Sequence, residues 1–206
     1  MTFLIVYNPV LLGSEGPGRI VLREGFETGL PSGWIQEYAN SPFGFNANWN
    51  TRRGAGFLAH GIRGDPDTAA VDTSNLVFQY EGIGHVTNLI TVPINLEFIV
   101  KPELTFWHAQ NKWGVDGPDQ LWIHYREGNT GPWVPLTPTP FTTPVEQWTH
   151  RSFLLPSGSD RFYLRLQGTS LFGMGICIDD FTITETGVIP RALSQVVTTQ
   201  ASTRFV

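Results

Sequence analysis

The chain has 206 residues, with 22 glycines, 15 prolines, 13% aromatic residues and only 15% charged residues. This length suits one domain with a large core, and the composition favours an all-β fold, because amphipathic helices need more Lys, Glu, Ala and Leu. The net charge of −5 and the lack of a basic run argue against binding to nucleic acid or anionic lipid. No stretch is long and apolar enough for membrane insertion.

The two ends of the chain are expected to lie outside the domain. In residues 1–18, two short apolar runs are separated by Asn8-Pro9 and followed by a Gly/Ser/Pro cluster, which predicts an arm or an edge strand. No basic segment and no small-residue cleavage site accompany these runs, so no cleavable signal peptide is visible. Residues 186–206 are rich in Thr, Ser and Gln, which leaves open a disordered tail or an arm that pairs with a neighbouring subunit. The domain is therefore expected over residues 19–185.

Short alternating segments separated by turn residues predict a β-sandwich or jelly roll. The first strand is expected between Arg19 and Phe26, followed by a Gly/Pro turn that ends at Trp34. Residues 40–75 are rich in Asn, Gly and Asp and are expected to be irregular. The further expected strands are Leu76–Tyr80, His85–Val92, Leu104–Gln110, Gln120–Arg126, Trp148–Leu155, Arg161–Gly168 and Gly173–Thr184.

The last expected strand carries two adjacent carboxylates, Asp179 and Asp180. Side chains alternate along a strand, so one of the two should face the interior, where an ionised carboxylate is costly unless it is paired. No Lys or Arg lies between Arg165 and Arg191. We therefore expect a hard metal ion, Ca²⁺, at this strand. The alternative is that these carboxylates cap turns or bind backbone amides.

The sequence contains seven tryptophans, more than a core of this size requires. Three are expected in the core or at its corners: Trp34, Trp107 and Trp148. Five residues are candidates for a ligand surface, because they lie near loops or opposite the apolar face of their strand: Trp113, Trp122, His124, Arg126 and Trp133. Aromatic rings beside polar groups suit stacking on sugar rings or a protein contact, and plain packing is the alternative.

No catalytic residues are expected. The sequence has no G-x-S-x-G turn, no H-E-x-x-H pair, no glycine-rich phosphate loop and no paired cysteines. The single Cys177 lies in an apolar strand and is expected to be a small core residue. Isolated histidines on strands, such as His108, are more often packed or solvated than catalytic.

The order of the segments resembles a known group of domains. FETGLPSGW, LITVPINL, LTFWHAQ, DQLWIHYR, FYLRLQG and GICIDDFTIT follow one another as in the cleaved-adhesin and choice-of-anchor domains of bacterial surfaces, and the set is similar to MAM domains. The resemblance covers about residues 20–185. It implies a MAM-like or galactose-binding-like jelly roll for adhesion or glycan binding, and in several members a structural Ca²⁺ that joins the first and last strands. The MAM cysteines and a sorting tail are absent from this sequence.

Carried over by position, the resemblance implies four metal ligands. Glu27 and Asp180 are the leading candidates, and Asp179 and Asp119 are weaker ones.

The favoured interpretation is a non-catalytic adhesion or carbohydrate-binding module, stabilised by Ca²⁺ and working outside the cell, at a cell surface or on a particle. Its partner would be a glycan or a surface protein. The two arms keep open a structural subunit of a large assembly, such as a virion surface or decoration protein, or a homo-oligomer joined through them. A glycan-active enzyme is a third alternative.

Overall fold

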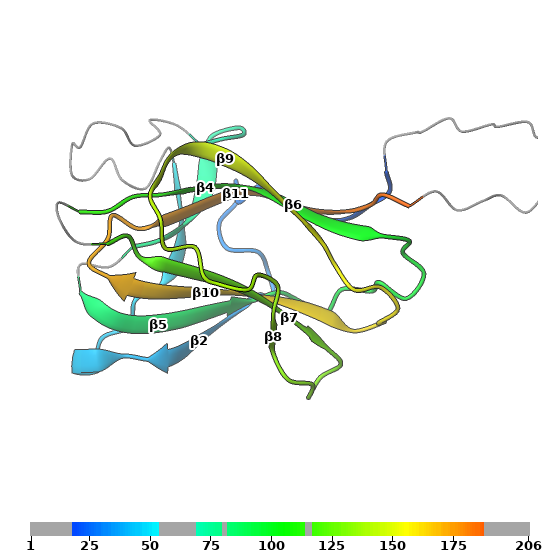
Figure 1. Cartoon of the computed structure of the whole chain (residues 1–206), viewed down its shortest axis with the longest axis horizontal. Coiled ribbons are helices and arrows are strands. Elements are labelled where there is room, and N and C mark those ends of the chain that lie inside the picture. Colours follow the sequence, from blue (N-terminus) through cyan, green and yellow to red (C-terminus); the bar gives the residue numbers. More distant parts are fainter. Residues whose placement is uncertain (1–17, 54–68, 80–81, 114–116, 188–206) are drawn as a thin grey trace, which may run out of the picture.

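The computed structural model describes residues 18–53, 69–79, 82–113 and 117–187, and the expected arms lie outside these ranges apart from residues 18, 186 and 187. The strands form two antiparallel sheets that pack face to face (Figure 1). The expected jelly-roll sandwich is therefore confirmed. In the part of the chain that is described, no helix is long and apolar enough to cross a membrane.

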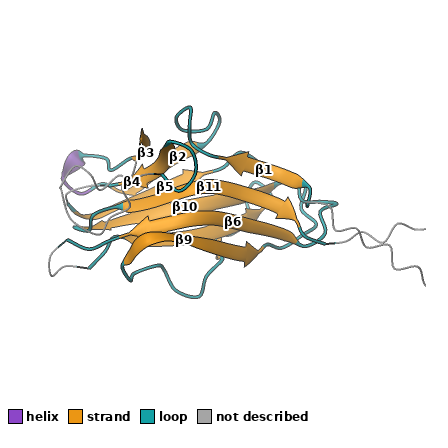
Figure 2. Cartoon of the chain, turned by 90° about the horizontal axis from the view of Figure 1, so that it is seen from above, coloured by secondary structure: helices purple, strands orange, loops and turns teal. Residues whose placement is uncertain are grey.

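The first sheet, sheet A, has the strand order β3-β4-β11-β6-β9, and β1 also pairs with β11 (Figure 2). Its strands are β1 (Ile20–Glu24), β3 (Trp49–Arg53), β4 (Ser74–Phe78), β6 (Pro102–Gln110), β9 (Val145–Leu154) and β11 (Ile176–Glu185). β4 pairs with the first half of β11 and β1 with its second half. The first and last strands of the domain therefore lie side by side.

The second sheet, sheet B, has the order β2-β5-β10-β7-β8. Its strands are β2 (Ile35–Asn40), β5 (Ile83–Ile90), β7 (Gln120–Glu127), β8 (Val134–Pro135) and β10 (Phe162–Leu171). A short 3-10 turn, η1 (Pro42–Gly44), follows β2.

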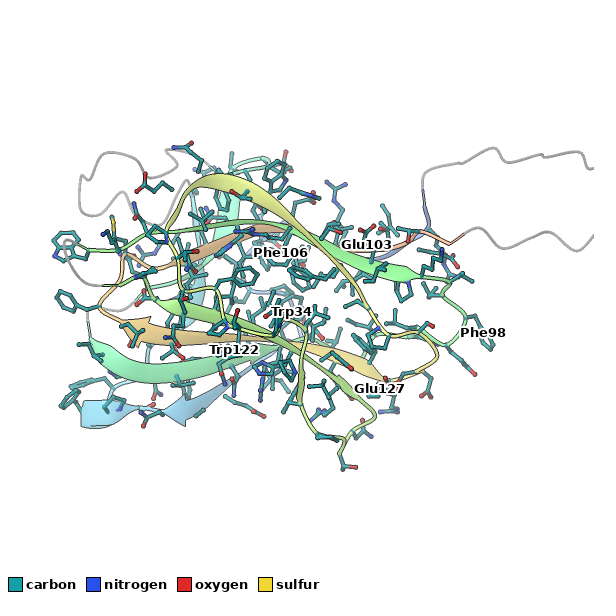
Figure 3. All side chains as sticks on the ribbon, in the orientation of Figure 1. Trp34, Phe98, Glu103, Phe106, Trp122 and Glu127 are labelled. Atoms are coloured by element: carbon teal, nitrogen blue, oxygen red, sulfur yellow. The ribbon has the colours of Figure 1, made fainter. Side chains whose placement is uncertain are left out.

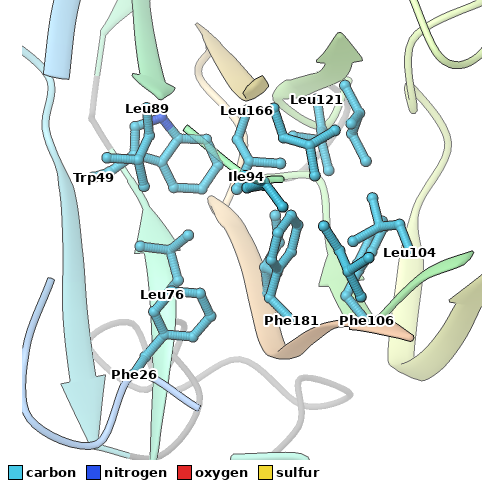
Figure 4. Packing of buried hydrophobic residues seen from close by; sticks show 14 of the residues in the cluster. Phe26, Trp49, Leu76, Leu89, Ile94, Leu104, Phe106, Leu121, Leu166 and Phe181 are labelled. Atoms are coloured by element: carbon cyan, nitrogen blue, oxygen red, sulfur yellow. The ribbon is translucent and has the colours of Figure 1, made fainter. Parts of the chain in front are cut away.

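The core fills the space between the sheets (Figure 4). Alternate residues of each strand point into it, so Leu121 and Ile123 of β7 meet Leu164 and Leu166 of β10 from the same sheet. Trp49 is fully buried and donates its Nε1–H to the Thr87 carbonyl over 3.1 Å. Other large side chains that are fully buried include Phe26, Phe78, Phe106, Phe162, Phe181, Leu76, Leu89, Leu96 and Leu104.

The three tryptophans expected in the core or at its corners lie in different environments. Trp34 packs edge-on against Phe26 and Phe181, with ring centroids 6.1 and 5.8 Å apart. Trp148 packs against a second buried cluster that contains Cys177, which is buried as expected. Trp107 is half-buried and contacts the His150 ring at 5.2 Å.

A bulge in β11 changes which residues of the strand face the core. Asp179 pairs with Trp107 and Thr182 with Thr105, so two residues of β11 oppose Phe106 alone. Before the bulge the even-numbered Ile176 and Ile178 enter the main core, and after it the odd-numbered Phe181 and Ile183 do so. Asp180, within the bulge, has φ of 45°, a conformation that Asp tolerates better than most residues.

The expectation that residues 40–75 are irregular is wrong at β3 and at the start of β4, and β2 was also not predicted. β2 and β3 are mostly exposed, with polar sequences IQEYAN and WNTRR that lack apolar alternation. β2 is held by pairing with β5, and β3 by pairing with β4. Long-range pairing thus sets these strands where local propensity is weak.

Candidate functional site

The outer face of sheet B gathers most of the residues expected to bind a ligand. In the register of β7 and β10, Trp122 lies opposite Gln167, His124 opposite Arg165, and Arg126 opposite Tyr163. Because the intervening residues of both strands point into the core, these side chains share the outer face. All of them are half-buried (Figure 3 labels Trp122).

Trp133, just before β8, completes this cluster. The guanidinium carbon of Arg126 lies 4.5 Å from the Trp133 ring centroid, and that of Arg165 lies 4.6 Å from it. Arg126 also lies 4.8 Å from the Tyr163 ring centroid. Elsewhere in the cluster, the ring centroids of Trp122 and His124 are 5.6 Å apart. We call Trp122, His124, Arg126, Trp133, Tyr163 and Arg165 the sheet B face.

Trp113, the fifth expected ligand residue, lies outside this face. It belongs to the connection between β6 and β7 and is 37% exposed. Two members of the face were not predicted, Tyr163 and Arg165. The signal was present, because Phe162, Leu164 and Leu166 alternate with polar residues in the sequence, and this alternation places Tyr163 and Arg165 on the opposite side of the strand.

Neither arginine of the face forms an ion pair with a carboxylate in the described part of the chain. Among the residues that the structure describes, Arg23 and Asp180 form the one side-chain ion pair. The Nε atoms of Arg126 and Arg165 are buried and have no hydrogen-bond partner. Burial lowers the pKa of Arg165, and the charge of Arg126 acts in the same direction while Glu37 opposes it. Burial, followed by the charge of Arg165, lowers the pKa of His124 to about 4, so this histidine is neutral at pH 7.

Two of the four expected metal ligands, Glu27 and Asp179, bind the same segment of the chain. Glu27 is exposed, and its Oε1 accepts the N–H groups of Thr73 and Ser74 at 3.1 and 2.7 Å. Asp179 is fully buried, and its Oδ2 accepts the N–H of Val71 at 2.8 Å. Carboxylates from the first turn and the last strand therefore both bind the segment 71–74.

The pKa values of these two carboxylates are shifted in opposite directions. Burial raises the pKa of Asp179 to about 6, against hydrogen bonds that lower it. The pKa of Glu27 is lowered, chiefly by the hydrogen bond from the Thr73 hydroxyl. The segment 71–74 thus donates hydrogen bonds to both carboxylates, and the Oδ1 of Asp179 also accepts the N–H of Asp180 at 2.7 Å.

The other two expected ligands have different partners. Asp180 Oδ1 accepts the Nε–H of Arg23 at 3.0 Å. Asp119 lies just before β7 and is buried against the turn between β10 and β11. Its Oδ1 accepts the N–H groups of Leu171 and Gly173 at 2.7 and 3.0 Å, and burial raises its pKa. No group of three or more acidic, His or Cys side chains is placed to hold a metal ion within the described ranges.

A separate groove of about 540 Å³ runs along β9 in sheet A. It is lined by Thr143, Pro144, Val145, Glu146, Gln147, Thr149 and Arg151. Arg151, one of these lining residues, stacks on Phe141 at 5.2 Å, and no tryptophan is among the residues that line the groove.

No known family model and no curated protein matches this sequence. Solved structures do share its fold. One is a family 61 carbohydrate-binding module, TmCBM61, in complex with β-1,4-galactotriose: it is 16% identical with a TM-score of 0.55, over 81% of this chain and 99% of that one. Another is the K1 cleaved adhesin domain of Lys-gingipain from Porphyromonas gingivalis, 17% identical with a TM-score of 0.54, over 81% and 98% of the two chains.

A third is the CBM22-1 xylan-binding domain of Paenibacillus barcinonensis Xyn10C, which is 14% identical with a TM-score of 0.54, over 84% and 97% of the two chains. At these identities the likeness establishes the jelly-roll fold alone. The structures that share this fold include a cleaved adhesin domain, which belongs to the group that the order of the sequence segments resembles.

Proposed function

We propose that this chain is a non-catalytic module that binds a glycan on the sheet B face, in an extracellular, cell-surface or particle-surface setting. The observation that carries the proposal is the placement of two half-buried tryptophans on one face, Trp122 beside His124 and Trp133 beside two arginines whose Nε donors are unsatisfied. Flat aromatic rings offer an apolar surface to the C–H face of a sugar, and convergent polar groups fix its orientation. Domains of the same fold that bind galactotriose and xylan add support.

The polar groups of the face suit sugar hydroxyls. Each guanidinium carries five N–H donors in a fixed plane, and stacking on Trp133 holds those of Arg126 and Arg165 in place. Gln167 donates its Nε2–H to Asn88 Oδ1 at 2.9 Å, which fixes an amide pair on the neighbouring strands. A glycan lying across β7 and β10 would meet rings and donors held in fixed positions, and therefore at low entropic cost.

The test is a glycan array probed with the full chain, with W122A and W133A, and with W107A as the matched control in sheet A. Loss of stacking should weaken binding at least about tenfold in the first two variants, which corresponds to about 1.4 kcal/mol. W107A should bind as the parent does. The proposal fails if no glycan binds, or if only W107A loses binding.

A structural Ca²⁺ held by Glu27 and Asp179 is a further part of this proposal. Ca²⁺ takes six to eight oxygens, so carbonyl groups of the segment between Ala69 and Ser74 would have to complete its shell. The raised pKa of the buried Asp179 carboxylate, and the segment that Asp179 and Glu27 both bind, support the idea. Such an ion would neutralise Asp179 and tie the first turn to the last strand.

A second candidate, a structural subunit of a large assembly, has one observation in its favour. The Glu185 N–H donates to the Arg19 carbonyl over 2.8 Å, so the described domain begins and ends at neighbouring positions of sheet A. Light scattering on the full chain tests this candidate, because a monomer at all concentrations would contradict it.

A further inference from the structure

We infer that the glycan recognised by the sheet B face is anionic, an acidic polysaccharide that presents carboxylate or sulfate groups to Arg126 and Arg165. This inference rests on the proposed glycan-binding function and specifies its ligand class.

The first argument is the spacing of the two positive charges. Both guanidinium groups contact one ring, Trp133, at 4.5 and 4.6 Å from its centroid. Like charges held this close repel each other, and the repulsion contributes to the lowered pKa of Arg165. An anion between or above them would relieve the repulsion and accept two-pronged hydrogen bonds from a planar guanidinium.

The second argument is the balance of charges that face the pair. Arg161, just before β10, lies two residues before Tyr163 and therefore on the same side of the strand, where it adds a third positive charge. It donates to Asn129 Oδ1 at 3.3 Å. Glu37 on β2 is the acidic group that acts on Arg165, but it is exposed and forms no ion pair with it. Glu127 pairs with the core residue Phe162, so its side chain lies on the opposite side of β7 from that of Arg126. The face is therefore locally positive on a chain whose net charge is −5.

The third argument concerns the cost of binding. A neutral sugar would cover the two guanidinium groups and remove water from them without supplying a countercharge, which is unfavourable. A carboxylate or sulfate supplies that countercharge and can accept two parallel hydrogen bonds from one guanidinium, which a neutral hydroxyl cannot do. The stacked arginines therefore favour an acidic over a neutral ligand of the same backbone.

Calorimetry on the full chain tests this inference with two matched pairs of polymers, at near-neutral pH. Polygalacturonate against its methyl-esterified form tests carboxylates, and dextran sulfate against dextran tests sulfates. We expect at least one acidic polymer to bind at least tenfold more tightly than its neutral counterpart, with an affinity that falls as NaCl is raised from 50 to 500 mM. The pair that shows the preference identifies the anionic group.

Variants locate the site. R126Q and R165Q should lose most of the preference for the acidic polymer, whereas R151Q, which also removes an arginine stacked on an aromatic ring, should keep it. The salt dependence of the parent chain is independent of whether a variant folds. Equal binding of acidic and neutral polymers would overturn the inference and leave the proposed function standing. Loss of the preference in R151Q alone would also overturn it, and binding to no polymer of either charge would overturn both.

Discussion

Arg23 of β1 donates its Nε–H to the Asp180 carboxylate of β11 across 3.0 Å, at the residue where β11 bulges. The sequence near Asp180 contains no basic residue, so the partner comes from the opposite end of the domain. The side chains of Arg23 and Asp180 are 54% and 27% exposed, so water screens the pair and its contribution to stability is small.

The backbone at Asp180 should matter more than its charge. Its φ of 45° lies in the left-handed region, which Asn also adopts but a β-branched residue does not. We expect D180N to cost less than about 1 kcal/mol in urea unfolding, as for an exposed ion pair, and R23Q to cost a similar amount. D180V should cost about 1–3 kcal/mol more. Equal losses in D180N and D180V would contradict this ranking.

Several elements could be predicted because their residues alternate strongly. β7 and β10 have apolar residues at every second position, and their expected ranges nearly match the observed ones. The same alternation placed Trp122, His124 and Arg126 on one face. β2 and β3 could not be found in this way, because few of their side chains are buried and cross-strand pairing holds them.

Contacts between distant segments could not be predicted from the sequence. The ion pair of Arg23 with Asp180 and the stacking of Arg165 on Trp133 each depend on strand order, which alternation does not give. The bulge in β11 has a sequence signal, the change from even-numbered to odd-numbered apolar positions after Ile178. Such a change of phase inside an apolar strand indicates a bulge with one extra residue, and the bulge in β11 includes Asp180.

Chelation tests the proposed calcium ion. If Ca²⁺ binds only the folded chain, adding it after EDTA treatment should raise the melting temperature, and a concentration of 100 Kd corresponds to about 2.7 kcal/mol. E27Q and D179N should lose most of this response. E97Q, an exposed carboxylate in another loop, should retain it. The site is ruled out if the melting curves with Ca²⁺ and with EDTA coincide.

Gly168 in β10 should not tolerate a side chain, because a Cβ there would lie 2.7 Å from two atoms of the Phe78 ring. Overpacking of this kind typically costs about 1–3 kcal/mol, so we expect G168A to lower the free energy of unfolding by that amount. G25A is the matched control, since nothing lies within 4 Å of its added Cβ. Adding F78L should restore part of the stability of G168A. If G168A and G25A unfold alike, the close packing of Gly168 on Phe78 is not a constraint.

His108 should make the domain sensitive to acid. Its ring is fully buried, with Nε2 at 3.1 Å from Gln110 Oε1 and Nδ1 without a hydrogen-bond partner. Burial is the main cause that lowers its pKa to about 3, from 6.5 in the unfolded chain. Between these values only the unfolded chain binds the proton, so stability is lost as the pH falls below 6.5, by up to about 1.4 kcal/mol per pH unit.

The contribution of His108 can be isolated by comparison with H108F, which keeps an aromatic ring in the core. Urea unfolding between pH 7.5 and 4.5 should show that the difference in unfolding free energy between the parent and H108F changes steadily below pH 6.5, in favour of the variant. Asp179, with its pKa raised to about 6 from 3.8, acts in the opposite direction over part of this range, but it is present in both chains and cancels in the difference. H124F should give a smaller change of the same sign, because His124 is only half-buried. A difference that stays constant with pH would mean that His108 accepts a proton in the folded chain as readily as in the unfolded one.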